Sequence, residues 1–324
     1  MAFVGRDLHW RGRDGKGRST WRRGWVAAGL ALLVGCVLAF HRQIPDQLGN
    51  FGSLTETFLP WVGLAVPVLL VVALLRRSAT ALAALLAPTL VWLLLFGGLL
   101  TDKSGGSYDF TAVQHNIDAS NTQVVSTMDT LMQAKPDVIS LEEITSAQLP
   151  TIERTLGGSY PYHAVEGTVG LWSKDPLTDI QPVDIKIGWI RALRATVQTP
   201  QGPLAVYVAH MPSVRVNFDN GFTANQRDHS AEALGEALSA EPLKKVLLLG
   251  DMNGTMNDRA LAPVTMQLQS AQGSAGGGFG FSWPSQFPMA RIDQIMSRGI
   301  TPTSAWVLPR TGSDHRPIAA HFEL

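Results

Sequence analysis

The sequence predicts an α/β protein in which two stacked mixed β-sheets flanked by helices form a four-layer sandwich, preceded by three transmembrane helices. Three observations carry this prediction. Uncharged apolar segments fill much of the first 100 residues, short apolar runs typical of strands then alternate with helical patterns, and polar residues stand at the ends of many runs. A chain of 324 residues is long enough for one large domain and a membrane part.

Charge is unevenly distributed along the chain, although the total is zero. Residues 1–100 hold ten Lys and Arg against four Asp and Glu, a net charge of +6, whereas residues 101–324 hold sixteen against twenty-two, a net charge of −6. An acidic body is a poor partner for duplex DNA, so no nucleic-acid partner is expected. The only cysteine, Cys36, lies in an apolar segment, which leaves the acidic part without a thiol, as suits an exported domain.

The first part of the chain predicts a membrane anchor. Residues 1–24 form an Arg- and Gly-rich arm with seven basic residues, which we interpret as a disordered cytoplasmic segment on a membrane surface. The apolar segments 25–40, 58–75 and 79–100 follow, and the last two approach the ~20 residues that cross a hydrocarbon core. Three uncharged runs so close together are hard to bury in a soluble helical core, so residues 25–100 are predicted to span the bilayer three times.

Basic residues at the ends of the apolar segments predict the orientation. The arm and the tight Arg76-Arg77 connection are basic, whereas residues 41–57 contain a single basic residue. Positive charge stays on the cytoplasmic side, so the N-terminus is predicted inside and the domain outside, in a multi-pass protein of the plasma membrane. The first segment could instead be a signal peptide, but no small-residue cleavage pattern follows it, and cleavage would leave the domain outside.

The extracytoplasmic domain is predicted to span residues 108–324, after a flexible linker at 101–107, TDKSGGS. Residues 200–203, PQGP, predict a hairpin turn, and the Gly-rich stretch 272–288 predicts a long, functional loop with four aromatic residues. Helices are expected at 121–134, 146–156 and 223–240. Strands are expected at 109–115, 136–141, 160–165, 168–173, 191–198, 203–209, 245–250, 290–296 and 317–323.

The stretch LLLGDMNG, residues 247–254, predicts a buried strand that stops at Gly250 and presents Asp251 and Asn253. Side chains two residues apart on an extended backbone point the same way. Functional groups of layered α/β proteins gather at the carboxyl ends of such strands. The same three residue types also make ordinary turns, so the interpretation depends on what the other strand ends carry.

Polar or acidic residues stand at the ends of further apolar runs. They are Asn116 and Asp118 in VQHNID, Glu142 and Glu143 in PDVISLEEI, His210 in VYVAHM, Asp293 in RIDQIM, and Asp314 and His315 in SDHRP. Carboxylate oxygens suit Mg²⁺ (or Mn²⁺), and Asn and His can bind phosphate oxygens. A carboxylate or a His–Asp pair can take a proton from water. No Cys pair or His-x-x-x-His spacing occurs, so a zinc site is not expected.

The ordered set HNID, LEE, AHM, GDMN, RIDQI and SDHRP, over about residues 108–324, resembles the endonuclease/exonuclease/phosphatase superfamily. That superfamily holds secreted DNases, abasic-site endonucleases, inositol-polyphosphate phosphatases and sphingomyelinases. The resemblance implies an Mg²⁺-dependent hydrolase of phosphoric esters or pyrophosphates. With the three apolar segments before the domain, the layout is similar to the membrane-anchored teicoplanin-resistance phosphatases of actinomycetes.

The resemblance implies a metal site and a catalytic set. Glu143 would bind the metal, with Asn116, Asp314 and Asp118 close to it. The catalytic set would be His210, Asp251, Asn253, Asp293 and His315. Either Asp251 or His315 would act as the base. Arg191, which begins a strand where the family often has Arg, would touch phosphate together with His210 and Asn253.

Some positions depart from the family pattern. Glu142 stands where the family has Gln, which adds a carboxylate beside the site, and Val208 stands where it has Asn. The Tyr of some nucleases has no clear counterpart, with only Tyr162 or His163 as candidates. These departures argue against a nuclease-like site more than against metal-dependent phosphate chemistry. Arg227, on a predicted helix, is expected at the surface or facing the substrate.

The predicted function is therefore a membrane-anchored phosphohydrolase that acts outside the cytoplasm. Three spans exceed what a tether needs, which favours a membrane lipid phosphate as substrate, such as a polyprenyl pyrophosphate of the cell-wall cycle. The resemblance implies the same substrate and a role in teicoplanin-type glycopeptide resistance. The alternatives are a sphingomyelinase-like phosphodiesterase, an extracellular nuclease and, in another class, a non-catalytic sensor of lipid phosphates.

Overall fold

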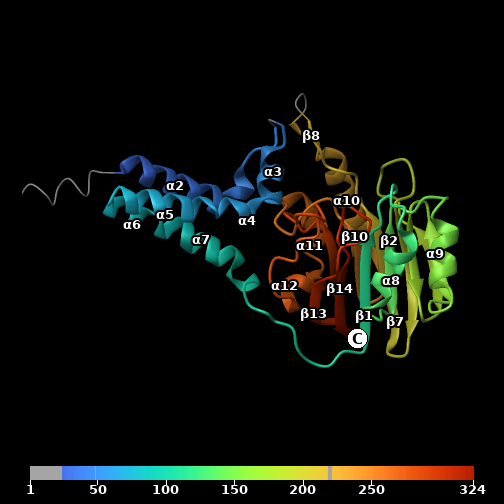
Figure 1. Ribbon diagram of the computed structural model, residues 1–324. Coiled ribbons are helices and arrows are strands. Elements are labelled where there is room, and N and C mark those ends of the chain that lie inside the picture. The colour runs from blue at the N-terminus through green and yellow to red at the C-terminus, as the bar shows by residue number, and fades with distance from the viewer. Residues whose placement is uncertain (1–23, 48, 218–220) are drawn as a thin grey trace, which may run out of the picture. The chain divides into compact units, whose positions relative to one another are not determined.

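The computed structural model describes residues 24–47, 49–217 and 221–324, and the predicted basic arm lies outside them apart from Gly24 (Figure 1). The chain forms two compact units. Within the described residues the smaller contains 24–41 and 59–96, and the larger contains 42–58 and 97–324. The sequence predicts residues 41–57 only as a connection between membrane helices, whereas the structure assigns most of this connection to the larger unit.

The smaller unit is a set of apolar helices. They are α2 (Trp25–Ala39), α4 (Leu59–Val62), α5 (Ala65–Leu75), α6 (Ala79–Ala84) and α7 (Leu86–Phe96). Small side chains on α2, α5 and α6, such as Ala31, Ala73 and Ala81, let these helices pack closely.

One helical run among the described residues, Ala79–Leu99, is long and apolar enough to cross a membrane, and only 17% of its most apolar stretch is buried. The helix 59–75 passes the same test only when it is joined to α3 (Phe51–Thr57) as one broken span, and α2 is shorter. The three predicted segments are therefore apolar helices, and three membrane crossings stay a prediction.

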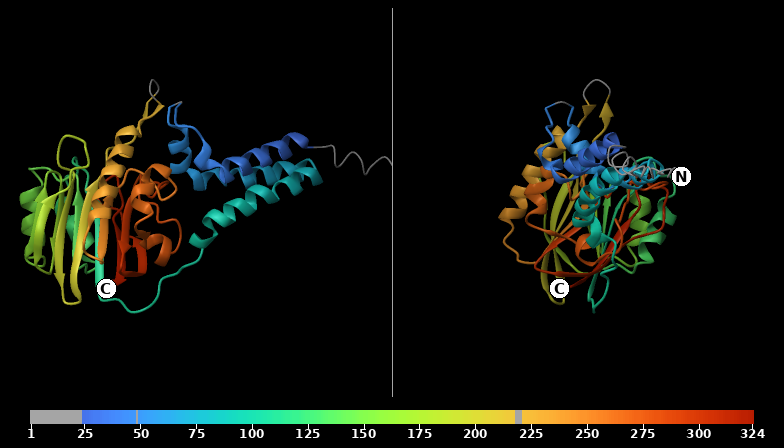
Figure 2. Two further views of the ribbon diagram at one scale, coloured as in Figure 1. Left: turned by 180° about the vertical axis from the view of Figure 1, so that it is seen from behind. Right: turned by 90° about the vertical axis from the view of Figure 1, so that its left-hand side faces the viewer.

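The larger unit contains two six-stranded mixed sheets that lie face to face (Figures 1 and 2). The first is built from β1 (Phe110–Asn116), β2 (Val138–Glu142), β3 (Tyr162–Glu166), β4 (Val169–Ser173), β13 (Thr301–Val307) and β14 (Ile318–Glu323). Its strand order is β13-β14-β1-β2-β4-β3. The second is built from β5 (Leu177–Pro182), β6 (Ala192–Thr199), β7 (Gly202–His210), β10 (Val246–Asp251), β11 (Gln269–Ser270) and β12 (Asp293–Arg298). Its strand order is β11-β12-β10-β7-β6-β5.

Alternation along each strand produces three apolar layers. On β1, Phe110 and Ala112 pack between the sheets, whereas Val113 points outward beneath α8 (Val124–Met132) and α9 (Leu149–Leu156). The outer face of the second sheet packs in the same way under α10 (Asn225–Ala240) and α11 (Ala262–Thr265). These layers confirm the predicted pair of stacked mixed sheets flanked by helices.

The predicted turn at 200–203 is confirmed, because Thr199 pairs with Gly202 across the β6–β7 hairpin.

The elements that the sequence did not predict lack a clear apolar pattern. The strand β5 was missed since it lies at a sheet edge and is largely exposed. Other elements that were not predicted are β13, the short strands β8 (Val216–Asn217), β9 (Gly221–Phe222) and β11, and the short helices α3, α11 and α12 (Ala271–Ala275).

Gly250 allows β10 to lie against β7, and its replacement is a test of this packing. Its φ is 153°, and a Cβ there would overlap the carbonyl oxygen of Ala209. We expect Gly250→Ala to lower the free energy of unfolding by at least about 3 kcal/mol, measured by denaturant unfolding. Gly158→Ala, where a Cβ meets nothing within 4 Å, is the control and should change it by less than about 1 kcal/mol. Equal stability of the two variants would contradict this interpretation.

Candidate active site

The candidate site lies where the inner faces of the two sheets become polar at one end. Gln114 and Asn116 continue the face of β1 that carries Phe110 and Ala112 in the core, and the strands of the second sheet show the same change. On β10 the inward residues Leu247 and Leu249 are followed by Asp251 in the same alternation. Because β1 runs parallel to β2 and β7 parallel to β10, the carboxyl ends of each pair meet at one edge.

Strand register brings three of the predicted catalytic residues together. Asp251 pairs with Asp293 on β12 on one side and with His210 on β7 on the other. In the first sheet, Asn116 pairs with Glu142. Sequence positions far apart therefore become neighbours through backbone pairing, before any side-chain contact is considered.

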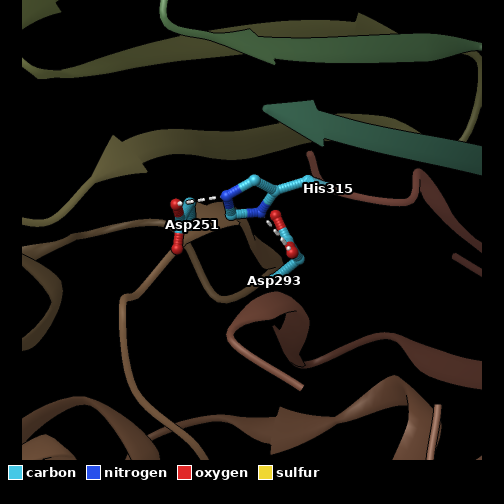
Figure 3. A group of neighbouring side chains, drawn as sticks. All are labelled: Asp251, Asp293 and His315. Atoms are coloured by element: carbon cyan, nitrogen blue, oxygen red, sulfur yellow. Dashed lines mark hydrogen bonds and ion pairs between the residues drawn. The ribbon is translucent and has the colours of Figure 1, made fainter. Parts of the chain in front are cut away.

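A buried imidazole lies between two of these carboxylates (Figure 3). His315 Nδ1 is 2.9 Å from Asp293 Oδ2, and His315 Nε2 is 3.7 Å from Asp251 Oδ2. Gln114 Nε2 donates to Asp293 Oδ1 at 3.1 Å and to Glu142 Oε2 at 2.8 Å, which links the pair to the other sheet. The imidazole orientation is thus fixed by a chain of buried polar contacts.

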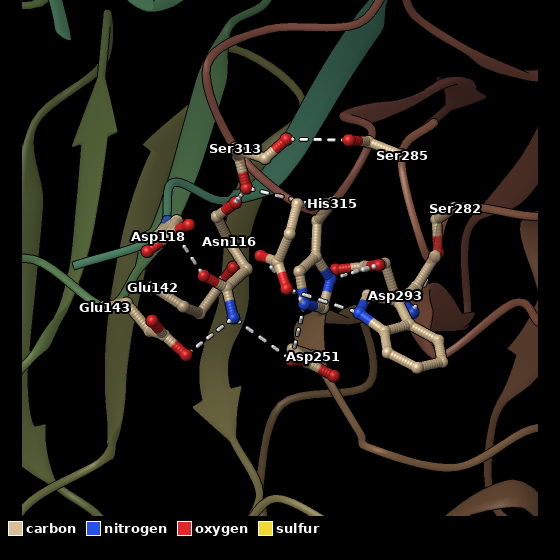
Figure 4. Close-up of polar contacts among 12 residues, drawn as sticks. Asn116, Asp118, Glu142, Glu143, Asp251, Ser282, Ser285, Asp293, Ser313 and His315 are labelled. Atoms are coloured by element: carbon tan, nitrogen blue, oxygen red, sulfur yellow. Dashed lines mark hydrogen bonds and ion pairs between the residues drawn. The ribbon is translucent and has the colours of Figure 1, made fainter. Parts of the chain in front are cut away.

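The predicted metal residues lie beside this pair (Figure 4). Asn116 Nδ2 donates to Glu143 Oε1 at 3.2 Å and to Asp251 Oδ2 at 3.1 Å. Asp118 and Glu143 both have positive φ, 64° and 61°, a conformation that is uncommon for Glu and is typical of functional sites. The Asp118 carboxylate accepts from Ser120.

Asp314 lies at the edge of the site. Its side chain is 59% exposed, with Oδ1 3.9 Å from His315 Nε2, and its Oδ2 accepts from Trp283 Nε1 at 3.3 Å. The backbone nitrogen of Ser285 donates to the Asp314 carbonyl at 2.6 Å. The structure thus brings Glu143 and Asn116 into contact, whereas the carboxylates of Asp314 and Asp118 bond to other neighbours.

The predicted phosphate-binding residues form the third side of the site. His210 Nε2 is 3.6 Å from Glu143 Oε1 and 3.7 Å from Asp251 Oδ2, and the Arg191 guanidinium contacts its ring. The backbone nitrogen of Asn253 donates to Asp251 Oδ1 at 2.8 Å, and its Nδ2 donates to the Met211 carbonyl at 3.0 Å. All ten predicted site residues thus belong to one region between the ends of the two sheets.

The comparisons with known proteins agree with this fold. The model of the Endonuclease/Exonuclease/phosphatase family matches residues 113–315, which contain most of both sheets. The chain belongs to this family. A search of the curated proteins gives no significant match.

Solved structures with the same fold cover about two thirds of this chain. D. rerio TDP2 complexed with single strand DNA product is 16% identical with a TM-score of 0.56, and the match covers 66% of this chain and 99% of that one. The mannosyl-6-phosphatase Bt3783 of Bacteroides thetaiotaomicron is 15% identical with a TM-score of 0.54, over 67% and 100%. The beta toxin of Staphylococcus aureus is 14% identical with a TM-score of 0.52, over 66% and 99%. At these identities the likeness establishes the fold alone.

The two histidines of the candidate site have opposite pKa shifts. Burial disfavours the charged form of His315, but Asp293 and Asp251 outweigh this and raise its pKa to about 10. Burial, Arg191 and His315 all lower the pKa of His210 well below its ordinary value. Burial raises the pKa of Asp251, and the His315 cation opposes that shift. At neutral pH, His315 is therefore an imidazolium and His210 is neutral.

The donor set fits the divalent metal that enzymes of this family usually use. Glu143, Asp251, Asp293 and Asp314 outnumber the nearby cationic groups, His315 and Arg191, so the site has a surplus of negative charge.

Asp251, Asp293 and His315 also lie close enough together to hold an ion. A protonated imidazole cannot ligate a metal, however, so Glu143 with Asn116 is the better pair. Oxygen donors of this kind suit Mg²⁺ or Mn²⁺.

Sequence reasoning missed several polar residues that hold the site. Gln114 stands inside a strand, and its only signal was its place two residues before Asn116 on the same face. Ser313 Oγ donates to the Asn116 carbonyl at 2.7 Å and accepts from the backbone nitrogen of His315 at 3.0 Å. Ser285 Oγ donates to the Ser313 carbonyl at 2.8 Å.

Other expectations need correction. Arg227 is not a surface residue and does not face the substrate: it is completely buried, with Nη1 2.9 Å from the carbonyl oxygen of Asn253. The candidates for a nuclease-like Tyr also lie on β3 at the edge of the first sheet, where His163 stacks on Trp172 and pairs with Glu153.

Glu142 offers a test of the buried network. It is fully buried, which raises its pKa to about 8, and it accepts hydrogen bonds from Ser140 and Gln114. Because its folded pKa lies above the unfolded value, the stability it contributes is complete at low pH and is lost as the pH rises toward 8. We therefore compare the Tm of Glu142→Gln with that of the unsubstituted protein, both measured in EDTA. The Tm of the variant minus that of the unsubstituted protein should be larger at about pH 8.5 than at about pH 5.

Glu142→Ala is the matched comparison. It removes the acceptor of the buried Ser140 hydroxyl and one of the two acceptors of the Gln114 amide, and should lower stability by about 1–3 kcal/mol at both pH values. A Tm difference between Glu142→Gln and the unsubstituted protein that does not change with pH would contradict the assigned ionisation.

Proposed function

We propose that the protein is a membrane-anchored, Mg²⁺- or Mn²⁺-dependent phosphohydrolase that acts outside the cytoplasm on a lipid-linked pyrophosphate. The observation that carries the hydrolytic part is the buried imidazolium of His315 between Asp293 and Asp251, beside Glu143 and Asn116. An acid, a base and oxygen donors for a cation are thus present within one site. A role in teicoplanin-type glycopeptide resistance is part of the same proposal.

Each group has a chemical task in this proposal. Glu143 and Asn116 would hold the metal, which supplies neutralisation of the charge on the phosphoryl group. The Asn253 amide and the Arg191 guanidinium donate hydrogen bonds to phosphoryl oxygens. Neutral His210 binds a phosphoryl oxygen through a ring N–H rather than through charge.

The electrostatics support Asp251 as the base. His315 already carries its second proton at neutral pH, so it cannot accept one from water. Asp251 has a raised pKa, is anionic when it functions, and lies 3.7 Å from His315 Nε2. Asp251 would take the proton of the attacking water, whose oxygen bonds to the terminal phosphorus as the bridging P–O bond breaks. The products are inorganic phosphate and the lipid monophosphate.

The apolar helices support a membrane substrate. A helix in the core of a soluble protein would be buried, but Leu75 and Leu94 of the smaller unit are 80% and 85% exposed. In the larger unit, Trp189 is 55% exposed and lies 5.0 Å from the Arg191 guanidinium, next to His210. An exposed aromatic ring beside a phosphate-binding cation is suited to a substrate with an apolar chain and an anionic head.

Phosphate release tests the proposal. The detergent-solubilised full chain, with Mg²⁺ or Mn²⁺, should release inorganic phosphate from a long-chain polyprenyl pyrophosphate, and EDTA should abolish release. Asp251→Asn removes the base and should lower kcat by about 10²–10⁴-fold. Asp129→Asn, at an exposed position of α8, is the matched control and should leave kcat unchanged.

The alternative functions are distinguished by assaying the same protein with other substrates. Release of a phosphorylated headgroup from a phospholipid, without release from the pyrophosphate, would replace the proposal by a phosphodiesterase. Cleavage of single-stranded DNA alone would indicate a nuclease. Binding of the pyrophosphate with no turnover of any phosphoester would indicate a lipid-phosphate sensor.

A further inference from the structure

The segment between the first two apolar helices contributes to the unit that carries the active site. Residues 42–58, of which all but residue 48 are described, contain α3 and belong to the larger unit. The chain therefore passes between the two units three times, after residues 41, 58 and 96. In sequence this segment is an ordinary polar connection, so its contacts with the catalytic unit need a physical explanation.

The contacts of the 42–58 segment converge on the stretch that follows Asn253. Ser53 Oγ donates to Asp258 Oδ2 at 3.0 Å, and Thr255 Oγ1 donates to the Glu56 carbonyl at 3.3 Å. The backbone nitrogen of Arg259 donates to Glu56 Oε2 at 3.1 Å, and its side chain pairs with Asp46. Ser53, Glu56 and Asp258 are buried. Groups of this polarity are buried only where their partners are fixed, so the contact is specific rather than incidental.

Arg227 connects this contact to the active site. Its Nη2 donates to Ser53 Oγ at 3.0 Å and is 2.7 Å from Asp258 Oδ2, while its Nη1 donates to the Asn253 carbonyl at 2.9 Å. The guanidinium is completely buried and planar, so movement of one partner changes the position available to the others. The close approach leaves no room at Gly254, where a Cβ would overlap Nη1.

Asn253, whose carbonyl oxygen accepts a hydrogen bond from Arg227, also contacts Asp251, the proposed base. Asn253 has a φ of 45°, its backbone nitrogen donates to Asp251 Oδ1 at 2.8 Å, and its Nδ2 lies 3.3 Å from Asp251 Oδ2. A backbone in this sparsely populated conformation persists when its surroundings fix it. The path from Ser53 to Asp251 therefore runs through Arg227 and the half-buried Asn253, with each residue in direct hydrogen-bond contact with the next.

We infer that the 42–58 segment is a positioning element of the active site, which acts through Arg227 to hold the Asn253 carbonyl and so sets Asn253 against Asp251. This inference rests on the proposed function for its effect on turnover. Arg227 and Ser53 are positioning residues that touch no reacting atom. The catalytic domain thus begins, in functional terms, before the second apolar segment rather than after the predicted linker at 101–107.

Variants on the 42–58 segment test the inference in the full chain. Ser53→Ala removes one hydroxyl, and Gly52→Val is a stronger wedge, since a Cβ there would overlap the Arg259 side chain and lies 2.5 Å from the Ile44 carbonyl. Thr55→Ala is the matched control, because its hydroxyl bonds to Phe51 within α3. We expect kcat to fall about tenfold or more for Ser53→Ala and further for Gly52→Val, with KM within about twofold, and to stay unchanged for Thr55→Ala.

The kinetics are measured well below the Tm of each variant, so that a loss of stability alone does not lower kcat. Hydrogen exchange of the peptide 252–258 provides a second readout that needs no turnover. It should be faster in Ser53→Ala and Gly52→Val than in the unsubstituted protein and Thr55→Ala. Parental kcat or parental exchange in both segment variants would overturn the inference. If the unsubstituted protein hydrolyses no phosphoester, the proposed function fails, and the exchange measurement still decides whether the segment holds Asn253.

Discussion

A single imidazole between two buried carboxylates sets the requirements for the rest of the site. His315 lies within 2.9 Å of Asp293 and 3.7 Å of Asp251, and both carboxylates are buried. Charges in such a place interact strongly because water does not screen them, and removal of one partner leaves a buried charge without compensation. The further carboxylates, Glu143 and Asp314, leave the site with a surplus of negative charge, which a divalent cation would neutralise.

The sheets make this interaction possible through their geometry. The β10–β12 register places Asp251 opposite Asp293, and Gly250 lets β10 approach β7 so that His210 lies on the other side. The first sheet contributes Gln114, which joins Asp293 to Glu142 across the core. Side chains alternate between the two faces of each strand. The inward-facing side chains are apolar within the sandwich and polar at its end, so stability and chemistry depend on the same strands.

The sequence predicted the features that depend on neighbouring residues, and it did not predict those that depend on residues far apart in the chain. The strand ends at Asp251 and His210 were predictable because each closes a local apolar run, and the order of motifs predicted that they belong to one site. Gln114 had no local signal, since a polar residue inside a strand reveals its partner only through the fold. The role of Arg227 was equally hidden, because its contact with Ser53 joins residues 174 positions apart.

The pH dependence of Asp293→Asn decides whether His315 is an imidazolium at neutral pH, on which the proposed roles of both His315 and Asp251 depend. With Asp293 and Asp251 both present, the imidazolium persists to about pH 10, so kcat/KM should fall on the alkaline side only near that value. Asn in place of Asp293 removes the anion that raises the pKa of His315 most, and the alkaline limb should move to lower pH by about one unit or more. An alkaline limb at the same pH in both proteins would contradict the account.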